Sequence, residues 1–123
     1  MKTPIVVEVQ TEYLVDSSHP AGNKFAFAYH ISITNQSNEP VQLLNRYWLI
    51  TDANGKTTEV SGAGVVGKQP IIQVGETYQY SSGAMLDTPV GSMQGYYEMQ
   101  RPCGECFQAP IAVFRLAVLN LIN

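Results

Sequence analysis

The residues at positions 25–34 constrain the fold more than any other part of the sequence, because they alternate between large apolar and small or polar side chains. The large apolar members are Phe25, Phe27, Tyr29, Ile31 and Ile33. A period of two places each set on one face of an extended strand, so the segment predicts a half-buried β-strand. No apolar pattern with a period of 3.6 residues persists for three helical turns. The sequence therefore predicts an all-β protein.

Seven further segments have β-type composition and are separated by turn-forming residues. They are 5–13, 41–51, 56–60, 71–74, 77–81, 93–101 and 107–119. Asn54-Gly55 predicts a type I′ hairpin turn, and residues 82–92 are expected to form a long loop. Short strands at regular spacing, with essentially no helix, predict an antiparallel β-sandwich of the immunoglobulin or fibronectin type III kind. An antibody-like disulfide between the sheets is excluded, because the only two cysteines are close neighbours.

Length and composition predict one domain over residues 1–123, since 45% of the chain is apolar and can form an ordinary core. Seven basic and ten acidic residues give a net charge of −3, and the cations are scattered, so nucleic acid is not an expected partner. The apolar run at residues 5–7 is too short for a signal peptide, and none approaches the roughly 18 residues of a membrane span. We expect a cytoplasmic protein without membrane insertion.

The segment 61–70, SGAGVVGKQP, contains the pattern most typical of a ligand site. Gly62, Gly64 and Gly67 fit GxGxxG, and the same stretch satisfies the GxxxxGK part of a Walker A loop. Both motifs hold phosphate where a helix begins. Pro70 and the β-formers that follow it oppose a helix here, so neither motif has its usual structural setting.

Two interpretations of this glycine loop stay open. In the first, backbone N–H groups around Gly62, Gly64 and Gly67, with Lys68 beside them, form a concave anion-binding nest. In the second, the glycines only permit a strand crossover or a bulge, as glycine in a β context usually does. The second interpretation is favoured, because the motif is weak without its helix.

The other residues whose side chains could take part in catalysis or metal binding are better explained by structural roles. Cys103 and Cys106 are spaced like a redox pair or half a zinc site, but only His19 and His30 could complete a zinc site. We expect free thiols at a turn, while a zinc site completed by a second subunit stays an alternative. His30 is expected to lie on the surface of a sheet rather than to act as a catalytic base, because no nucleophile with an acidic partner is signalled nearby. Asp52 is expected to be a turn residue rather than a metal ligand. No metal site and no cofactor are expected.

Four segments carry a resemblance to a known family. They are RYWLITDANGK (46–56), EVSGAGVVGKQP (59–70), GETYQYSSG (75–83) and LDTPVGSMQGYYEM (86–99). Together they resemble the bacterial ApaG family over most of the chain, a pattern far more specific than GxGxxG alone. Two departures are Tyr47, where the family would have histidine, and the CGEC turn at residues 103–106, where it has an ordinary polar turn.

This resemblance implies a fibronectin type III-like sandwich, a genetic association with cobalt and magnesium resistance or efflux, and no established enzyme activity. It also implies relatives in which the domain is attached to eukaryotic interaction proteins. We therefore predict a non-enzymatic protein-interaction module linked to divalent-cation homeostasis, whose protein partner the sequence does not identify. The alternative is a small protein that binds pyrophosphate or a nucleotide phosphate in the loop from Gly62 to Lys68. The apolar residues 117–122 are expected to finish a sheet or to cover an edge in a homodimer.

Overall fold

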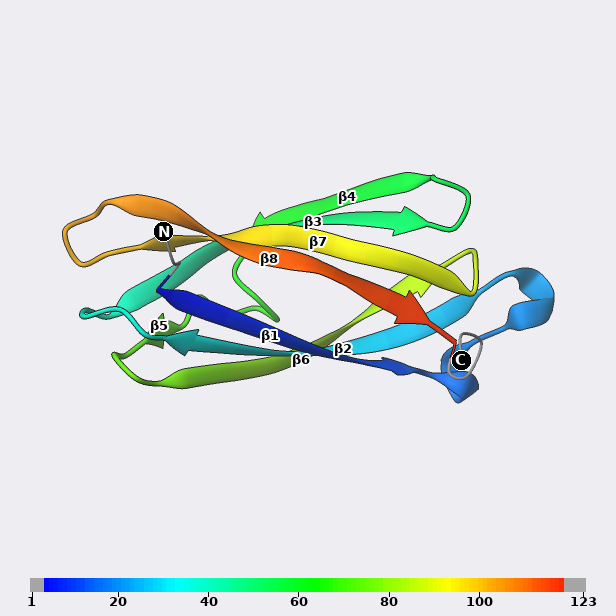
Figure 1. Cartoon of the computed structure of the whole chain (residues 1–123), viewed down its shortest axis with the longest axis horizontal. Helices are drawn as coiled ribbons and strands as arrows, with labels where there is room; N and C mark the ends of the chain where they lie inside the picture. Colours follow the sequence, from blue (N-terminus) through cyan, green and yellow to red (C-terminus); the bar gives the residue numbers. More distant parts are fainter. Residues whose placement is uncertain (1–3, 119–123) are drawn as a thin grey trace.

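The computed structural model describes residues 4–118 and places eight strands of this part of the chain in two antiparallel sheets (Figure 1). The strands are β1 (Ile5–Tyr13), β2 (Phe25–Asn35), β3 (Val41–Asp52), β4 (Thr57–Ala63), β5 (Ile71–Ile72), β6 (Thr77–Leu86), β7 (Val90–Gln100) and β8 (Cys106–Ala117). Between β1 and β2 the chain forms two short 3-10 turns, Val15–Ser17 and Pro20–Gly22. The predicted all-β class is confirmed.

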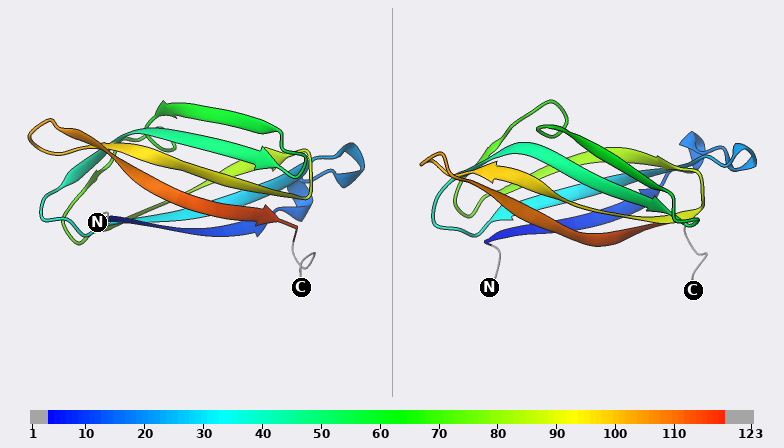
Figure 2. Two further views of the ribbon diagram at one scale, coloured as in Figure 1. Left: turned by 45° about the horizontal axis from the view of Figure 1, so that its top comes forward. Right: turned by 90° about the horizontal axis from the view of Figure 1, so that it is seen from above.

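One sheet has the strand order β1-β2-β6 and the other has the order β4-β3-β7-β8, with β5 pairing with β3 beyond the end of β4. Figure 2 shows the two layers in further views, with the hairpins β3–β4 and β7–β8 in the same layer. This pairing of a three-stranded with a five-stranded antiparallel sheet is that of an immunoglobulin or fibronectin type III-like sandwich, as predicted. The edge strands are β1 and β6 in one sheet and β4 and β8 in the other.

The core between the sheets is built on the alternation in β2. Phe27, Tyr29, Ile31 and Ile33 are buried, while Ala28, His30 and Ser32 between them face the solvent side of the sheet. Trp48 of β3 lies opposite, with 2% of its surface exposed, and its ring is 5.4 Å from that of Tyr29 between centroids. The apolar faces of the two sheets thus interdigitate around one tryptophan.

The prediction of a long loop over residues 82–92 is wrong. β6 continues to Leu86 and β7 begins at Val90, so only three residues connect them. Serine and glycine have a low preference for β-strands. Here, however, the pairing with β2 is unbroken from Thr77 to Leu86 and supplies hydrogen-bond partners for the backbone. Tertiary pairing outweighs local propensity in this segment.

The hairpin turns also differ from the expectation. At Asn54-Gly55 only the glycine has a positive φ, of 84°, so the turn is not type I′. Instead, the Oδ1 atom of Asp52 accepts hydrogen bonds from the backbone N–H groups of Asn54 (2.8 Å) and Lys56 (2.9 Å). Asp52 is therefore a turn residue, as predicted. A pair of residues with positive φ does occur, but at Val66 and Gly67.

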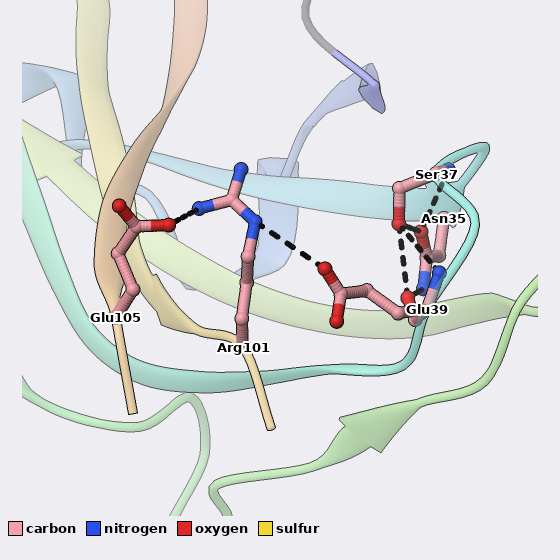
Figure 3. A network of polar contacts seen from close by, with 5 residues as sticks. All are labelled: Asn35, Ser37, Glu39, Arg101 and Glu105. Atoms are coloured by element: carbon pink, nitrogen blue, oxygen red, sulfur yellow. Dashed lines mark hydrogen bonds and ion pairs between the residues drawn. The ribbon is translucent and has the colours of Figure 1, made fainter. Parts of the chain in front are cut away.

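A polar network ties the β2–β3 turn to the β7–β8 hairpin at one end of the sandwich (Figure 3). The buried amide of Asn35 bonds to Ser37 and to the carbonyl oxygen of Glu39. Arg101 forms ion pairs with Glu39 (3.8 Å) and Glu105 (3.0 Å). These contacts fix the end of the sandwich from which β3 departs.

No helix within residues 4–118 is long and apolar enough to cross a membrane. At the C-terminal end, β8 extends to Ala117 and so completes the edge of its sheet. The rest of the apolar segment predicted to finish a sheet or cover a dimer edge lies largely outside the described residues.

Candidate functional site

The glycine loop connects β4 to β5, both of which pair with the same edge of β3. No helix begins after Gly67. Instead, the N–H of Val65 donates to the carbonyl oxygen of Lys68 at 2.8 Å, and the N–H of Lys68 donates back to Val65 at 3.0 Å. The loop is therefore a tight hairpin turn whose two central residues, Val66 and Gly67, have φ values of 49° and 76°.

Most polar groups of the loop are directed toward β3. The N–H of Gly64 donates to the carbonyl oxygen of Leu44 at 2.8 Å. The Nη1 atom of Arg46 donates to the carbonyl oxygens of Ala63 (3.1 Å) and Gly64 (3.0 Å). The guanidinium thus holds the loop by its carbonyl oxygens.

The four residues predicted to bind an anion lie in this loop and at the end of β4 that leads into it. Gly62 is in β4 opposite Arg46, Gly64 is buried, and Gly67 and Lys68 are exposed. The N–H groups of Gly64 and Lys68 donate to two different carbonyl oxygens, so they do not point at a common position. Anion binding at these residues stays a prediction.

Val66 stands out in the loop because a β-branched residue rarely adopts a positive φ. Holding it there costs about 1–3 kcal/mol. The fold does not bury the side chain in return, since 64% of the residue is exposed. The loop therefore holds an apolar side chain in solvent in a strained conformation.

A cleft of about 390 Å³ opens beside the loop, at the edge of the sandwich where β6 faces the β4–β5 connection. In Figure 1 this connection descends from the end of β4 toward the layer that contains β6. The cleft is lined by Tyr29, Arg46, Tyr80, Ser81, Ser82 and the segment 63–67 without Gly64. Arg46 is the only charged residue among them, and within residues 4–118 it has no ion pair with a carboxylate.

Tyr80, which lines the cleft, contacts the fully buried Tyr97. The hydroxyl groups of Tyr80 and Tyr97 are hydrogen-bonded to each other across the sandwich. Burial is the main cause that raises the pKa of both hydroxyls well above their usual range, although Arg46 works in the opposite direction at Tyr80. Both tyrosines are therefore neutral at physiological pH, which leaves the guanidinium to determine the charge of the cleft.

Sequence reasoning missed Arg46 as a site residue. A signal was present, because Arg46 precedes the buried Trp48 by two positions and must share its face of the strand. A cation on the inner face of a strand indicates either a partner or a ligand.

On the outer face of the other sheet, His30 has polar neighbours that the sequence did not reveal. Its Nδ1 atom is 2.6 Å from the Oγ of Ser81, and its Nε2 atom is 3.4 Å from a carboxylate oxygen of Glu12. The sequence signalled neither neighbour, because the register of β1, β2 and β6 brings them to His30. The group is exposed on a sheet surface, with 44% of the His30 side chain accessible, so His30 is a sheet-surface histidine as expected.

Cys103 and Cys106 are both exposed thiols at the β7–β8 hairpin, and no disulfide joins them. The turn is closed by hydrogen bonds from the N–H of Arg101 to Glu105 and from the N–H of Gly104 to Arg101. In the part of the chain that the structure describes, no three His, Cys, Asp or Glu residues are grouped as a metal site requires.

The loop geometry predicts different effects for two glycine-to-alanine substitutions. A Cβ atom on Gly64 would lie 2.3 Å from the carbonyl oxygen of Lys68, whereas one on Gly67 would meet nothing within 4 Å. We expect Gly67→Ala to lower the free energy of unfolding by about 1 kcal/mol and Gly64→Ala by roughly 2–3 kcal/mol. Denaturant unfolding followed by the fluorescence of Trp48, the single tryptophan, measures both.

Lys68→Ala is the control for this pair and should leave stability nearly unchanged, because the side chain is exposed. The same proteins test the anion interpretation. If pyrophosphate at millimolar concentration shifts no backbone amide in residues 62–68, that interpretation is contradicted. If it does, and Lys68→Ala weakens binding in a salt-dependent way, the loop is an anion site.

Comparison with known proteins identifies relatives that span nearly the whole chain. The family pattern described as ApaG domain matches residues 15–101. The chain is 54% identical to Protein ApaG of Cronobacter sakazakii and 52% identical to Protein ApaG of Escherichia coli. Each match extends over 119 residues, which are 97% of this chain and 95% of the relative.

Solved structures agree with these matches. An X-ray structure of a structural genomics target, 50% identical in sequence, gives a TM-score of 0.92 and covers 97% of this chain and 90% of that chain. The crystal structure of a Bordetella pertussis protein named ApaA is 41% identical, also gives 0.92, and covers 94% of each chain. Because the family pattern and the relatives agree over most of the length, the chain belongs to the ApaG family.

Proposed function

We propose that this protein is a non-enzymatic interaction module of the cytoplasm whose contact surface surrounds Val66 at the mouth of the Arg46 cleft. The observation that carries the proposal is the exposed apolar side chain on a strained turn. A backbone outlier persists only where the surrounding structure enforces it, and such outliers gather at ligand and partner sites. An apolar residue beside a cationic cleft combines two features that protein partners recognise.

A non-catalytic role fits the chemistry of the cleft. General acid–base catalysis needs a group with a pKa near the working pH, whereas burial keeps Tyr80 and Tyr97 protonated. Arg46 supplies a charge but cannot exchange a proton near neutrality. Magnesium-dependent turnover of ATP or a dinucleoside polyphosphate that is lost on Arg46→Gln would contradict this part of the proposal.

We further propose that the module serves divalent-cation homeostasis through a protein partner rather than by holding the ion itself. The association of the family with cobalt and magnesium resistance motivates this step. The described residues 4–118 contain no group of three metal-ligating side chains, so the contact surface is a better route to cation efflux than a metal site.

Val66→Asn tests the contact surface without weakening the fold. Asparagine tolerates a positive φ better than valine, so the substitution should raise the free energy of unfolding by about 1 kcal/mol. It also removes the apolar contact. We therefore expect less captured partner when the purified protein is cross-linked in an extract of its native host, although the protein is more stable.

Val113→Asn is the matched control, because Val113 is exposed to a similar extent (60%) but lies on β8, at the opposite edge of the same sheet. It should capture the same partner as the wild type. Host cells that carry Val66→Asn should tolerate less cobalt than cells that carry Val113→Asn. Unchanged capture by Val66→Asn would refute the contact surface, whereas lost capture with unchanged cobalt tolerance would refute only the link to cations.

A further inference from the structure

β6 differs from the other edge strands in carrying none of the features that normally protect a sheet edge. Edge strands are usually protected from pairing by charged residues, proline or bulges. Within residues 77–86 there is no charged residue and no proline, and the register with β2 runs without a shift.

The three other long edges have such protection. β1 carries Glu8 and Glu12, and β4 carries Glu59. β8 carries Pro110 and Arg115, and its pairing with β7 includes a register shift. The lack of protection is therefore specific to β6 and not a general property of this sandwich.

The free side of β6 is open to a further strand. In an antiparallel pair, alternate residues direct their N–H and C=O groups away from the partner, so half of the β6 backbone groups face away from β2. No other described residue bonds to the backbone of residues 77–86. Ser81, Ser82 and Gly83, at the middle of the strand, are all exposed, and Gly83 has no side chain to obstruct an incoming backbone.

The cleft beside this edge determines which side chains an added strand should carry. Side chains of an added strand would alternate between the outer face of β6 and the cleft, where they would meet the guanidinium of Arg46 next to Tyr80 and Ser82. Within residues 4–118 this side chain donates two hydrogen bonds, both from Nη1, so Nε and Nη2 can face a ligand. A carboxylate matches this donor pair in charge and in geometry.

We infer that β6 binds an extended peptide segment of a partner protein by strand addition, with an aspartate or glutamate of that segment placed against Arg46. The inference rests on the proposed interaction function and specifies the chemistry of the partner. A second copy of this chain is a poorer occupant when paired through β6, because residues 77–86 contain no carboxylate and would leave Arg46 unpaired. Backbone pairing provides the affinity, and the acidic side chain provides the selectivity.

The probe is a capped heptapeptide of alternating threonine and valine with glutamate at its centre, and the matched control has glutamine there. Titration of the wild-type protein, followed by amide chemical shifts, should perturb residues 77–86 and the side chain of Arg46. The glutamine peptide should bind about five- to tenfold more weakly, as expected for the loss of one charge-assisted contact. Arg46→Gln should abolish the difference between the two peptides.

Methylation of the peptide amides tests strand addition directly and needs no change in the protein. Two versions of the glutamate peptide are methylated on alternate amides, one on the odd and one on the even positions. Only one set of amides faces β6, so one version should lose binding while the other keeps it. Equal binding of both versions, or equal loss, would overturn strand addition.

These outcomes are separate from those of the Val66 experiment. If partner capture depends on Val66 but no peptide perturbs β6, the strand-addition inference is wrong and the interaction function stands. If the chemical shifts of residues 77–86 change with protein concentration alone, and sedimentation shows a dimer, the occupant is a second copy and the inference is also wrong.

Discussion

Replacing Asn35 by leucine is expected to lower the free energy of unfolding by about 3 kcal/mol. Asn35 is fully buried, and its Nδ2 atom donates to the carbonyl oxygens of Glu39 and Ile72, each at 2.9 Å. Its Oδ1 atom accepts from the N–H of Ser37 at 2.9 Å and from the hydroxyl of the same residue at 2.6 Å. Leucine has the same branching and the same number of side-chain heavy atoms and is not smaller, so the loss reflects the hydrogen bonds rather than a cavity.

The effect is large because the amide joins segments that have few other connections. The β2–β3 turn depends on it through Ser37 and Glu39 (Figure 3), and the two-residue strand β5 depends on it through Ile72. Removing the amide leaves backbone groups without partners away from water, which costs more than an exposed hydrogen bond. Ser37→Ala is the milder comparison and should cost about 1 kcal/mol, since the N–H of Ser37 still reaches Asn35. A change below 0.5 kcal/mol for Asn35→Leu, about the size seen at ordinary surface sites, would show that water replaces the amide.

The strands that could be predicted are those in which burial alone decides the pattern. β1 begins and ends at the predicted residues 5 and 13, and β2 extends one residue beyond the predicted segment. Both follow a period of two because one face contacts the core. Residues 82–86 carry no comparable signal, since serine and glycine do not show which face is buried, and their strand is defined by pairing with β2.

The cleft could not be predicted, because it combines segments that only the fold brings together. Arg46 comes from β3, Val66 from the loop and Tyr80 from β6. The contact between His30 and Ser81 has the same origin, namely the register that places these residues opposite each other in neighbouring strands. A single sequence contains the residue types but not the register.

Several residues of the family-like segments have structural duties in this fold. Thr88 accepts a hydrogen bond from the N–H of Ala53 and donates to the carbonyl oxygen of Val90. A Cβ atom on Gly91 would lie 2.6 Å from the carbonyl oxygen of Thr51. Thr88 and Gly91 of the segment LDTPVGSMQGYYEM therefore have structural roles at the connection between β6 and β7, and functional interpretation is better directed to the cleft.

Gly95→Ala is expected to have the largest effect of any substitution considered, with a loss of roughly 4 kcal/mol or more, or failure to fold. Gly95 lies in β7 opposite Trp48 of β3. A Cβ atom would be 1.9 Å from the carbonyl oxygen of Tyr47 and 3.1 Å from the Cα of Trp48. Both obstacles are backbone atoms in a central strand pair, so no side-chain rotation relieves the clash.

Gly83→Ala is the matched control, since it is also a strand glycine but its Cβ would meet only the carbonyl oxygen of Phe27, at 3.3 Å. It should change the free energy of unfolding by less than about 1 kcal/mol. Urea unfolding measured by Trp48 fluorescence compares the two variants. If Gly95→Ala folds with near wild-type stability, β3 and β7 can separate without disturbing the core.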